Sequence, residues 1–307
     1  MGSVYAVDFI YGAVYNCGMS NTVKLRAFAK VNLSLNITGR DENKGMHMLD
    51  SVMMSVDLFD TVTVTPRGDE KINVKFIGAE VGEDNTAYKA ARAVMDIIGG
   101  CGYDITVEKG IPMGAGLGGS SADGAAVLRA LDVFYGLRNR GVDLQKTALS
   151  VGSDVPFMLT GGLARVKGFG DDLFFIENKL KLFIVGLMGR SVSTSAAYKK
   201  FDELYPSGAF CPTDTDKLEG LLLDGDNSAI NHLGNALYES AACLSPEIKD
   251  NAETLASYGA EVCLTGSGGM VLGYFTDMQK FYECYSELKG RARVFAPVGT
   301  GILHERV

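Results

Sequence analysis

The sequence predicts an α+β fold made of two domains. Several segments near the N-terminus alternate polar and apolar residues, which is the pattern of half-buried strands. A glycine-rich loop at residues 112–121 separates such a segment from a helical one. A second region, beginning after Gly170, has apolar strands and helical stretches of its own.

The first strands lie between residues 23 and 76. Val23 to Ile37 has strand character, and residues 39–46 are rich in charge and glycine, as turns are. Residues 61–65 alternate Thr and Val before Pro66, and residues 72–76 alternate in the same way. We therefore expect antiparallel strands with one buried face.

A helix, a strand and a second helix follow in the first region. Asn85 has the side chain of a helix N-cap, and apolar residues then recur at helical spacing as far as Gly99. Residues 103–107 alternate as a strand does, and residues 125–135 have a helical pattern after the glycine loop.

The second region begins with an apolar strand at residues 182–187. Helices are expected at residues 227–243 and 246–258. Two strands, at residues 261–264 and 270–275, flank a second glycine turn, Thr265-Gly-Ser-Gly-Gly269.

Composition excludes several classes of protein. The formal net charge of −8 argues against a nucleic-acid binder, which usually carries a basic stripe. Six scattered cysteines form no Cys-x-x-Cys pair, and the three histidines lack metal-ligand spacing. No apolar run reaches the roughly 18 residues of a membrane span. We expect a cytoplasmic protein with residues 1–20 as an extension outside the catalytic fold.

The loop Pro112-Met-Gly-Ala-Gly-Leu-Gly-Gly-Ser-Ser121 is the strongest functional signal. Four glycines within six residues let the backbone turn sharply and approach a ligand closely. Free N–H groups at a helix start, together with the helix dipole, favour phosphate. No Gly-Lys-Ser/Thr ends the loop, so it is not a Walker A loop. A flexible Gly/Ser turn is the alternative, which the flanking strand and helix disfavour.

Three other segments are weak signals by themselves. Ala29-Lys30-Val31-Asn32-Leu33 places a polar pair in an apolar strand, where a solvent-facing lysine is the default interpretation. Asp154, in Gly152-Ser-Asp-Val-Pro-Phe157, is equally consistent with a helix cap. The turn at Thr265–Gly269 alone is also inconclusive.

Together, in this order, the four segments resemble the superfamily named for galactokinase, homoserine kinase, mevalonate kinase and phosphomevalonate kinase. The resemblance extends from about Asn21 over nearly the whole chain. It is strongest to the 4-diphosphocytidyl-2-C-methyl-D-erythritol kinases of the non-mevalonate isoprenoid pathway, through residues 29–40, 45–49, 83–85 and 152–157. It implies an ATP-dependent transferase with a nucleotide-binding domain at residues 21–170, completed by residues 296–307, and a smaller α+β domain at residues 171–295.

The resemblance also implies roles for individual residues. Asp154 is expected to be the catalytic base, with Lys30 beside it, and Asn32 to position the erythritol part. Residues expected to bind ATP are Asn85, Lys109, Pro112, Gly114, Gly116, Leu117, Gly118, Gly119, Ser120 and Ser121. Mg²⁺ is expected with ATP, and Ser121 is a plausible contact, but no acidic ligand stands out in the sequence.

The expected substrate site centres on a cytosine ring. His47 matches the histidine of the family's Gly-Tyr-His segment, while Met46 replaces the aromatic residue that stacks on the base. Tyr198 matches the aromatic on the other side of the ring. A thioether also packs on aromatic rings, so the cytosine site stays a hypothesis. Thr194, Thr265 and Gly266 complete the expected substrate contacts.

Three alternatives remain at this point. Met46 leaves open a kinase of the same superfamily that acts on another alcohol, such as homoserine or mevalonate. A mevalonate-diphosphate decarboxylase shares the fold and the loop but not the Gly-x-His segment. A non-catalytic nucleotide-binding module needs neither Lys30 nor Asp154. We expect a small-molecule substrate, no nucleic acid, no membrane, and a monomer or weak homodimer.

Overall fold

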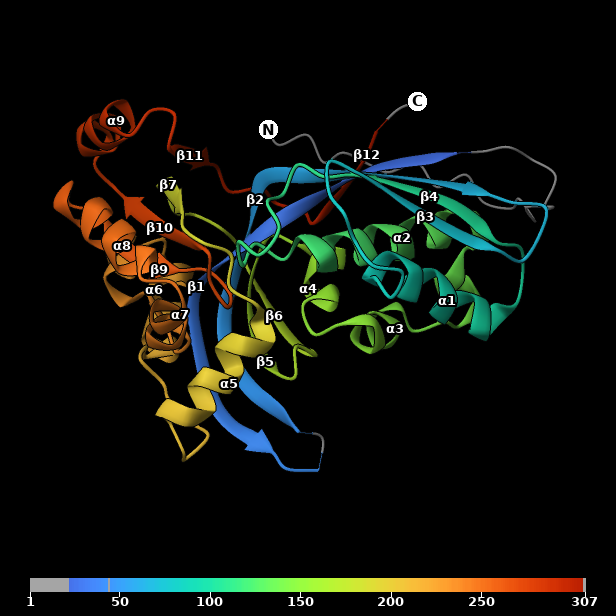
Figure 1. Ribbon diagram of the computed structural model, residues 1–307, viewed down its shortest axis with the longest axis horizontal. Helices are drawn as coiled ribbons and strands as arrows, with labels where there is room; N and C mark the ends of the chain where they lie inside the picture. Colours follow the sequence, from blue (N-terminus) through green and yellow to red (C-terminus); the bar gives the residue numbers. More distant parts are fainter. Residues whose placement is uncertain (1–21, 44, 306–307) are drawn as a thin grey trace.

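A computed structural model describes residues 22–43 and 45–305 of the chain. The extension expected at residues 1–20 lies outside the described residues. The described part contains an eight-stranded and a four-stranded sheet, each covered by helices (Figure 1). No described helix is long and apolar enough to cross a membrane.

The larger sheet is built on a long antiparallel hairpin, β1 (Val23–Asp41) and β2 (Met46–Pro66). Its register shifts at three places, so the hairpin bends, and in Figure 1 it runs through both parts of the molecule. The other strands are β3 (Ile72–Ile77), β4 (Tyr103–Glu108), β5 (Leu163–Gly168), β6 (Asp172–Ile176), β8 (Gly234–Asn235) and β12 (Ile302–His304).

Helices cover one face of this sheet (Figure 1). They are α1 (Thr86–Ile98), α2 (Gly119–Tyr135), α3 (Leu144–Val151) and α4 (Val155–Thr160), with the 3-10 turn η1 (Leu137–Arg140). The central helix α2 has eleven buried residues because it packs against the sheet and against α1, α3 and α4. It therefore holds the glycine loop at its N-terminus in a fixed place.

The smaller sheet has the antiparallel order β11-β7-β10-β9. Its strands are β7 (Phe183–Met188), β9 (Glu261–Leu264), β10 (Met270–Phe275) and β11 (Ala292–Phe295). Around it lie α5 (Thr194–Leu204), α7 (Tyr238–Leu244), α8 (Glu247–Ser257) and α9 (Met278–Glu287). The helix α6 (Thr215–Asp224) and the 3-10 helix η2 (Asn227–His232) instead join the core of the larger sheet, where α6 contacts β2. All six residues of β10 are buried, which explains its unbroken apolar run.

The α+β class and most expected elements are confirmed. Asn85 caps α1 by accepting a hydrogen bond from the Tyr88 amide, and the helix ends at Gly99 as predicted. β1 and β2 are longer than the expected strands because the hairpin continues across both parts of the molecule. Helix α2 begins at Gly119 inside the loop, six residues before the expected start.

Two predictions about elements are wrong. β3 does not pair antiparallel; it pairs in parallel with β4, because α1 forms the crossover between them. The helix expected at residues 227–243 is broken into η2, β8 and α7. It is interrupted where Gly234 and Asn235 pair with β1 in parallel. Tertiary pairing here overrides the helical pattern.

The predicted domain division stays a prediction, and three strand pairings bear on it. β12 pairs with β1 through Leu25 and His304, so the C-terminal segment returns to the first sheet. β6 pairs with β5, so a boundary at Gly170 divides a hairpin of the larger sheet. β8 also joins this sheet from within residues 171–295.

Candidate active site

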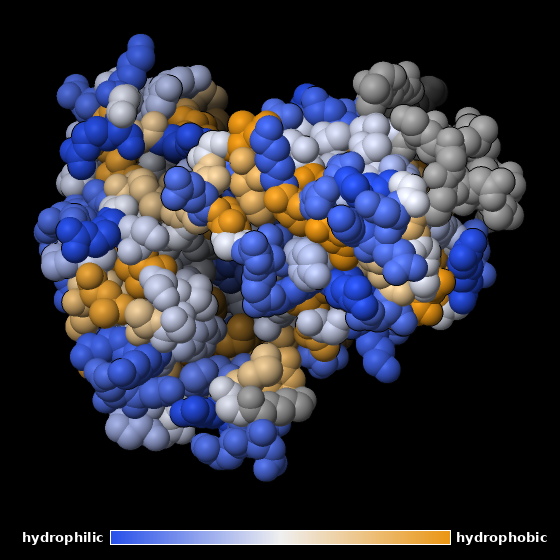
Figure 2. All heavy atoms as spheres, turned by 45° about the vertical axis from the view of Figure 1, so that its right-hand side comes forward, coloured by the Kyte–Doolittle hydropathy of each residue, from blue (hydrophilic) through white to orange (hydrophobic). Residues whose placement is uncertain are grey.

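A cleft of about 810 Å³ lies between the two parts of the molecule, and Figure 2 shows the surface hollowed there. It is lined by the β1–β2 hairpin, the glycine loop, the segment before α4, and α5. Pockets of this size hold small molecules and cofactors. All the predicted site residues except Thr265 line it, so the fold gathers segments far apart in sequence.

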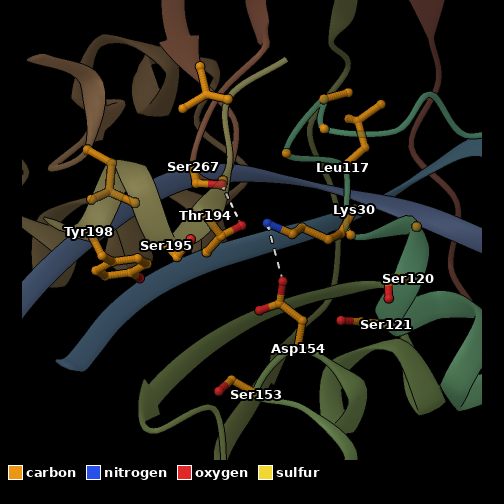
Figure 3. A pocket seen from close by; sticks show the side chains of 18 of the residues that line it. Lys30, Leu117, Ser120, Ser121, Ser153, Asp154, Thr194, Ser195, Tyr198 and Ser267 are labelled. Carbon is orange, nitrogen blue, oxygen red and sulfur yellow. Dashed lines mark hydrogen bonds and ion pairs between the residues drawn. The ribbon is translucent and has the colours of Figure 1, made fainter. Parts of the chain in front are cut away.

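The glycine loop bends over one end of the cleft and leads directly into α2. Gly118 is the N-cap residue of α2 with φ of 72°, a left-handed conformation that favours glycine. Ser120 and Ser121 lie in the first turn of α2 and line the cleft (Figure 3). The loop thus presents backbone N–H groups and two hydroxyls at the positive end of a 17-residue helix, an arrangement suited to phosphate.

Lys30 and Asp154 meet in the middle of the cleft (Figure 3). The Lys30 Nζ lies 3.6 Å from Asp154 Oδ2, although the residues come from β1 and from the N-terminus of α4. The Lys30 side chain is 3% exposed and that of Asp154 is 28% exposed. A carboxylate open to the cleft beside a buried ammonium can accept a proton from a bound hydroxyl. The Lys30 amide also donates to the Leu117 carbonyl, which fixes β1 to the loop.

Asn32 lies beneath the cleft with a fully buried side chain. Its Oδ1 accepts hydrogen bonds from Lys30 Nζ at 2.6 Å and from the Gly266 amide at 2.9 Å. Its Nδ2 donates to the Ser51 hydroxyl at 2.9 Å. The expected contact between Asn32 and the substrate stays a prediction.

The turn at residues 265–269 packs against the glycine loop. The Thr265 side chain is fully buried, and its hydroxyl lies 3.3 Å from the Gly116 carbonyl oxygen. A Cβ added to Gly116 would lie 2.0 Å from the Thr265 carbonyl oxygen, so both turns need glycine for close backbone approach. Ser267 and Thr194 hydroxyls lie 2.9 Å apart, linking this turn to α5 (Figure 3).

The other end of the cleft holds an aromatic pair. The His47 and Tyr198 rings stack with centroids 4.9 Å apart and an interplanar angle of 28°. The His47 Nε2 lies 2.7 Å from an Asp202 carboxylate oxygen. Burial, with the charge of Asp154 adding to it, raises the pKa of the Tyr198 hydroxyl. Met46 is 41% exposed and lines the same end.

Lys109 is held between two buried carboxylates. Its ammonium donates to Asp60 and, at 2.8 Å, to Asp123. Burial alone would lower the pKa of Lys109, but Asp123 and Asp60 outweigh it and raise the pKa. The second Asp60 oxygen accepts from the Gly110 and Ile111 amides, which fixes the backbone before the loop. Lys109 lines the cleft, but its charge is already paired.

The residues present fit a magnesium ion carried by a nucleotide. No group of three His, Cys, Asp or Glu side chains in the described part of the chain could hold a metal alone. However, Mg²⁺ is usually held by one or two carboxylates, waters and substrate phosphates. Asp154 and the Ser121 hydroxyl line the cleft near the loop and supply oxygen ligands of this kind.

Five cleft or floor residues were missed by the sequence predictions: Ser51, Asp60, Asp123, Lys199 and Asp202. The first three have no local signature because their roles follow from contacts across strands. A signal existed for Asp202, which stands four residues after Tyr198 on α5, but not for Lys199, because adjacent helical residues do not share a face. Residues four apart on a helix lie on the same face.

Comparison with known proteins identifies the family. A model described as "GHMP kinases N terminal domain" matches residues 85–162. The chain is 34% identical over 258 residues to the 4-diphosphocytidyl-2-C-methyl-D-erythritol kinase of Chlorobium limicola, covering 82% of this chain and 88% of that protein. It is 30% identical to the kinase of the same name from Clostridium beijerinckii, covering 87% and 96%.

The chain belongs to the 4-diphosphocytidyl-2-C-methyl-D-erythritol kinase family.

Solved structures agree with this assignment. A crystal structure of 4-(cytidine 5'-diphospho)-2C-methyl-D-erythritol kinase is 30% identical and covers 90% of this chain and 99% of its own, with a TM-score of 0.70. A homoserine kinase from Cytophaga hutchinsonii is 18% identical and covers 95% and 100%, with a TM-score of 0.67. The second likeness shows the fold alone, so the kinase family of the first takes precedence.

Proposed function

We propose that this chain transfers the γ-phosphoryl group of ATP to the 2-hydroxyl of 4-diphosphocytidyl-2-C-methyl-D-erythritol. The observation that carries the proposal is the Lys30–Asp154 pair, which lies between the glycine loop and the His47–Tyr198 pair in one cleft. Membership of the kinase family supports the same substrate. The alternative alcohols, homoserine and mevalonate, lack a ring that would use the aromatic end.

In the proposed reaction, Asp154 accepts the proton of the substrate hydroxyl. The oxygen attacks the γ-phosphorus, the bond from that phosphorus to the bridging oxygen of ADP breaks, and ADP leaves. The Lys30 ammonium stabilises the charge on the attacking oxygen, and the glycine-loop amides hold the phosphates in line. Mg²⁺, when bound with ATP, neutralises phosphate charge, and Ser121 and Asp154 would hold it.

The aromatic end supports recognition of a nucleobase. A planar base can stack against the His47–Tyr198 pair, and Met46 supplies a polarizable contact in place of a second stacking ring. Asp202 contacts Nε2 of His47 and so orients its ring beside Tyr198. The cytosine of the diphosphocytidyl substrate is the base that the family assignment favours.

A coupled ADP-release assay tests the proposal. The full chain is assayed with 4-diphosphocytidyl-2-C-methyl-D-erythritol, homoserine and mevalonate at equal concentrations. We expect turnover with the first alcohol only. Turnover with homoserine or mevalonate, and none with the diphosphocytidyl substrate, would refute the substrate assignment while leaving the kinase chemistry in place. The monomeric or weakly dimeric state stays a prediction.

A further inference from the structure

The shortest polar contact of the Lys30 ammonium in the described structure is not to Asp154. Its Nζ lies 2.6 Å from Asn32 Oδ1 but 3.6 Å from Asp154 Oδ2. A lysine ends in a point charge on a flexible four-carbon stem, so one carboxylate at that distance fixes it poorly. The position of this charge therefore depends on Asn32.

The orientation of the Asn32 amide follows from the chemistry of its neighbours. An ammonium and a backbone N–H can only donate, so the Lys30 and Gly266 groups must both face the amide oxygen. On the other side, the Ser51 hydroxyl donates its one proton to the Ser34 carbonyl. It must therefore accept from the Asn32 NH₂ group. Ser51 thus reinforces the orientation that the two donors favour and holds the NH₂ side of the amide in place.

The same amide joins the catalytic lysine to the glycine loop. Its oxygen holds the Gly266 amide, and the Asn32 backbone N–H donates to the Thr265 hydroxyl. That hydroxyl lies 3.3 Å from the Gly116 carbonyl oxygen and 3.5 Å from Asn32 Oδ1, and it can donate its one proton to either. Lys30, the turn at residues 265–269 and the loop are thereby connected through one fully buried side chain.

We propose that Asn32 is a positioning residue, with Ser51 holding the NH₂ side of its amide in place, and that the pair holds the Lys30 ammonium in register with the glycine loop. This inference rests on the proposed kinase function. It differs from the expected substrate contact, because a fully buried amide whose oxygen already accepts from two donors has little to offer a ligand. We therefore expect the Asn32–Ser51 pair to affect kcat rather than KM.

The test compares three variants of the full chain. Ser51→Ala removes the acceptor that holds the NH₂ side of the amide, whereas Ser51→Thr keeps the hydroxyl. Ser34→Ala is the matched control, since it removes a fully buried hydroxyl of the same hairpin that accepts from the Val52 amide and does not touch Asn32. Each variant is measured for kcat, for KM of ATP and of the alcohol, and for Tm.

We expect Ser51→Ala to lower kcat on the order of 10- to 100-fold with KM for ATP unchanged, as misplacement of a catalytic group does. Ser51→Thr is expected to restore kcat. Ser34→Ala is expected to lower Tm but to keep kcat. Full kcat in Ser51→Ala, or an equal loss of kcat in Ser34→Ala, would overturn the inference.

Two further measurements cover the cases in which Ser51→Ala does not fold or the proposed substrate is not phosphorylated. If Ser51→Ala does not fold, Asn32→Asp is measured in its place. The new carboxylate still accepts from Lys30 and Gly266 but has no N–H to donate to Ser51. We therefore expect kcat to fall and KM for ATP to stay unchanged. Full kcat in that variant would refute the inference. If the wild type does not phosphorylate the diphosphocytidyl alcohol, the proposed substrate fails. The variants can then be compared by their slow hydrolysis of ATP, in which water accepts the phosphoryl group, and this comparison still tests the role of Asn32.

Discussion

Single residues in the cleft owe their chemistry to neighbours that no motif specifies. Asp154 is partly exposed because it stands at the start of the short helix α4, and Lys30 is buried because β1 passes under the loop. Lys109 has the residue type expected near a nucleotide, yet two carboxylates already pair its charge. Whether a charged side chain is available to a ligand therefore depends on the groups that pair with it in the fold.

Replacing the proposed base tests the chemical step. Asp154→Asn keeps the size of the side chain but cannot accept a proton, so we expect kcat to fall on the order of 10²- to 10⁴-fold. KM for ATP is expected to stay within a few-fold, because the glycine loop is unchanged. Steady-state kinetics check this, and near-normal turnover would remove Asp154 from the mechanism.

Lys199 provides a test of diphosphate recognition. It is exposed, lines the cleft beside Tyr198, and has no ion pair within the described residues, whereas its neighbour Lys200 is paired with Glu203. We expect Lys199→Ala to raise KM for the diphosphocytidyl substrate about ten-fold, with KM for ATP unchanged. Lys200→Ala is the matched control. An equal effect of both variants would argue against a direct contact.

Asp123 makes the stability of the fold depend on pH. Burial raises the pKa of Asp123 to about 8, with Lys109 opposing the shift and Asp60 adding to it. The pKa in the unfolded chain is about 3.9. The folded state binds this proton more tightly than the unfolded chain does, so the protonated carboxyl adds to the free energy of unfolding. This contribution is complete below about pH 4 and is lost as the pH rises towards 8.

Asp123→Asn mimics the protonated carboxyl and removes this dependence. Between pH 5 and 8 we expect the free energy of unfolding of the wild type to fall relative to that of the variant, by up to about 1.4 kcal/mol per pH unit. Urea unfolding at several pH values measures both. The prediction would be contradicted if the free energies of unfolding of the wild type and the variant changed equally with pH over this range.

At the scale of elements, two glycine turns act as one unit. The turn between β9 and β10 contacts the loop before α2 through backbone groups, because Gly116, Gly266 and Gly269 leave no room for a Cβ between them. The Met270 amide also donates to the Ala115 carbonyl. The smaller sheet therefore supports the phosphate loop from the opposite side of the cleft.

Gly116→Ala tests this contact, with Gly141→Ala as the control. Both glycines have a positive φ, 79° and 76°, so both variants carry a backbone cost of about 1–2 kcal/mol. Only at Gly116 would the new Cβ meet a backbone atom, while nothing lies within 4 Å at Gly141. We expect Gly116→Ala to raise KM for ATP and Gly141→Ala to lower stability alone. Equal kinetics in the two variants would refute the coupling of the turns.

For the whole molecule, the C-terminal segment completes the larger sheet. The Gly301 carbonyl accepts from the Phe28 amide in β1, and its own amide donates to the Thr160 carbonyl at the end of α4. The Val298 amide donates to the Ser55 carbonyl in β2. The last described residues thus support the strand and the helix that present Lys30 and Asp154.

Gly301→Ala is expected to lower the free energy of unfolding by about 1–3 kcal/mol, as overpacking does. Its Cβ would lie 2.0 Å from the Met158 carbonyl oxygen. Gly299→Ala, two residues away with nothing within 4 Å, should be nearly neutral. Thermal unfolding measures Tm for both variants. Equal Tm values would show that the backbone around Gly301 shifts to accept the Cβ without loss of stability.

Features that depend on interactions between near neighbours in the chain could be predicted from the sequence. Alternation placed β3 and β4, apolar segments on either side of a glycine turn placed β9 and β10, side-chain capping placed the start of α1, and glycine spacing identified the phosphate loop. Lys30 and Asp154 could be named because the motifs around them are local and characteristic of the family. The order of strand, helix and strand at residues 72–108 is itself typical of a parallel pair such as β3–β4.

The contacts between these segments became known from the fold. The Asn32 amide bonds to Gly266 across 234 positions of sequence, and Lys109 meets Asp60 across 49. No periodicity records such pairs, because which strands pair and which turns touch depends on packing over the entire chain. Hence the sequence indicated a lysine, an asparagine and a glycine turn, and the fold assigned each its partner.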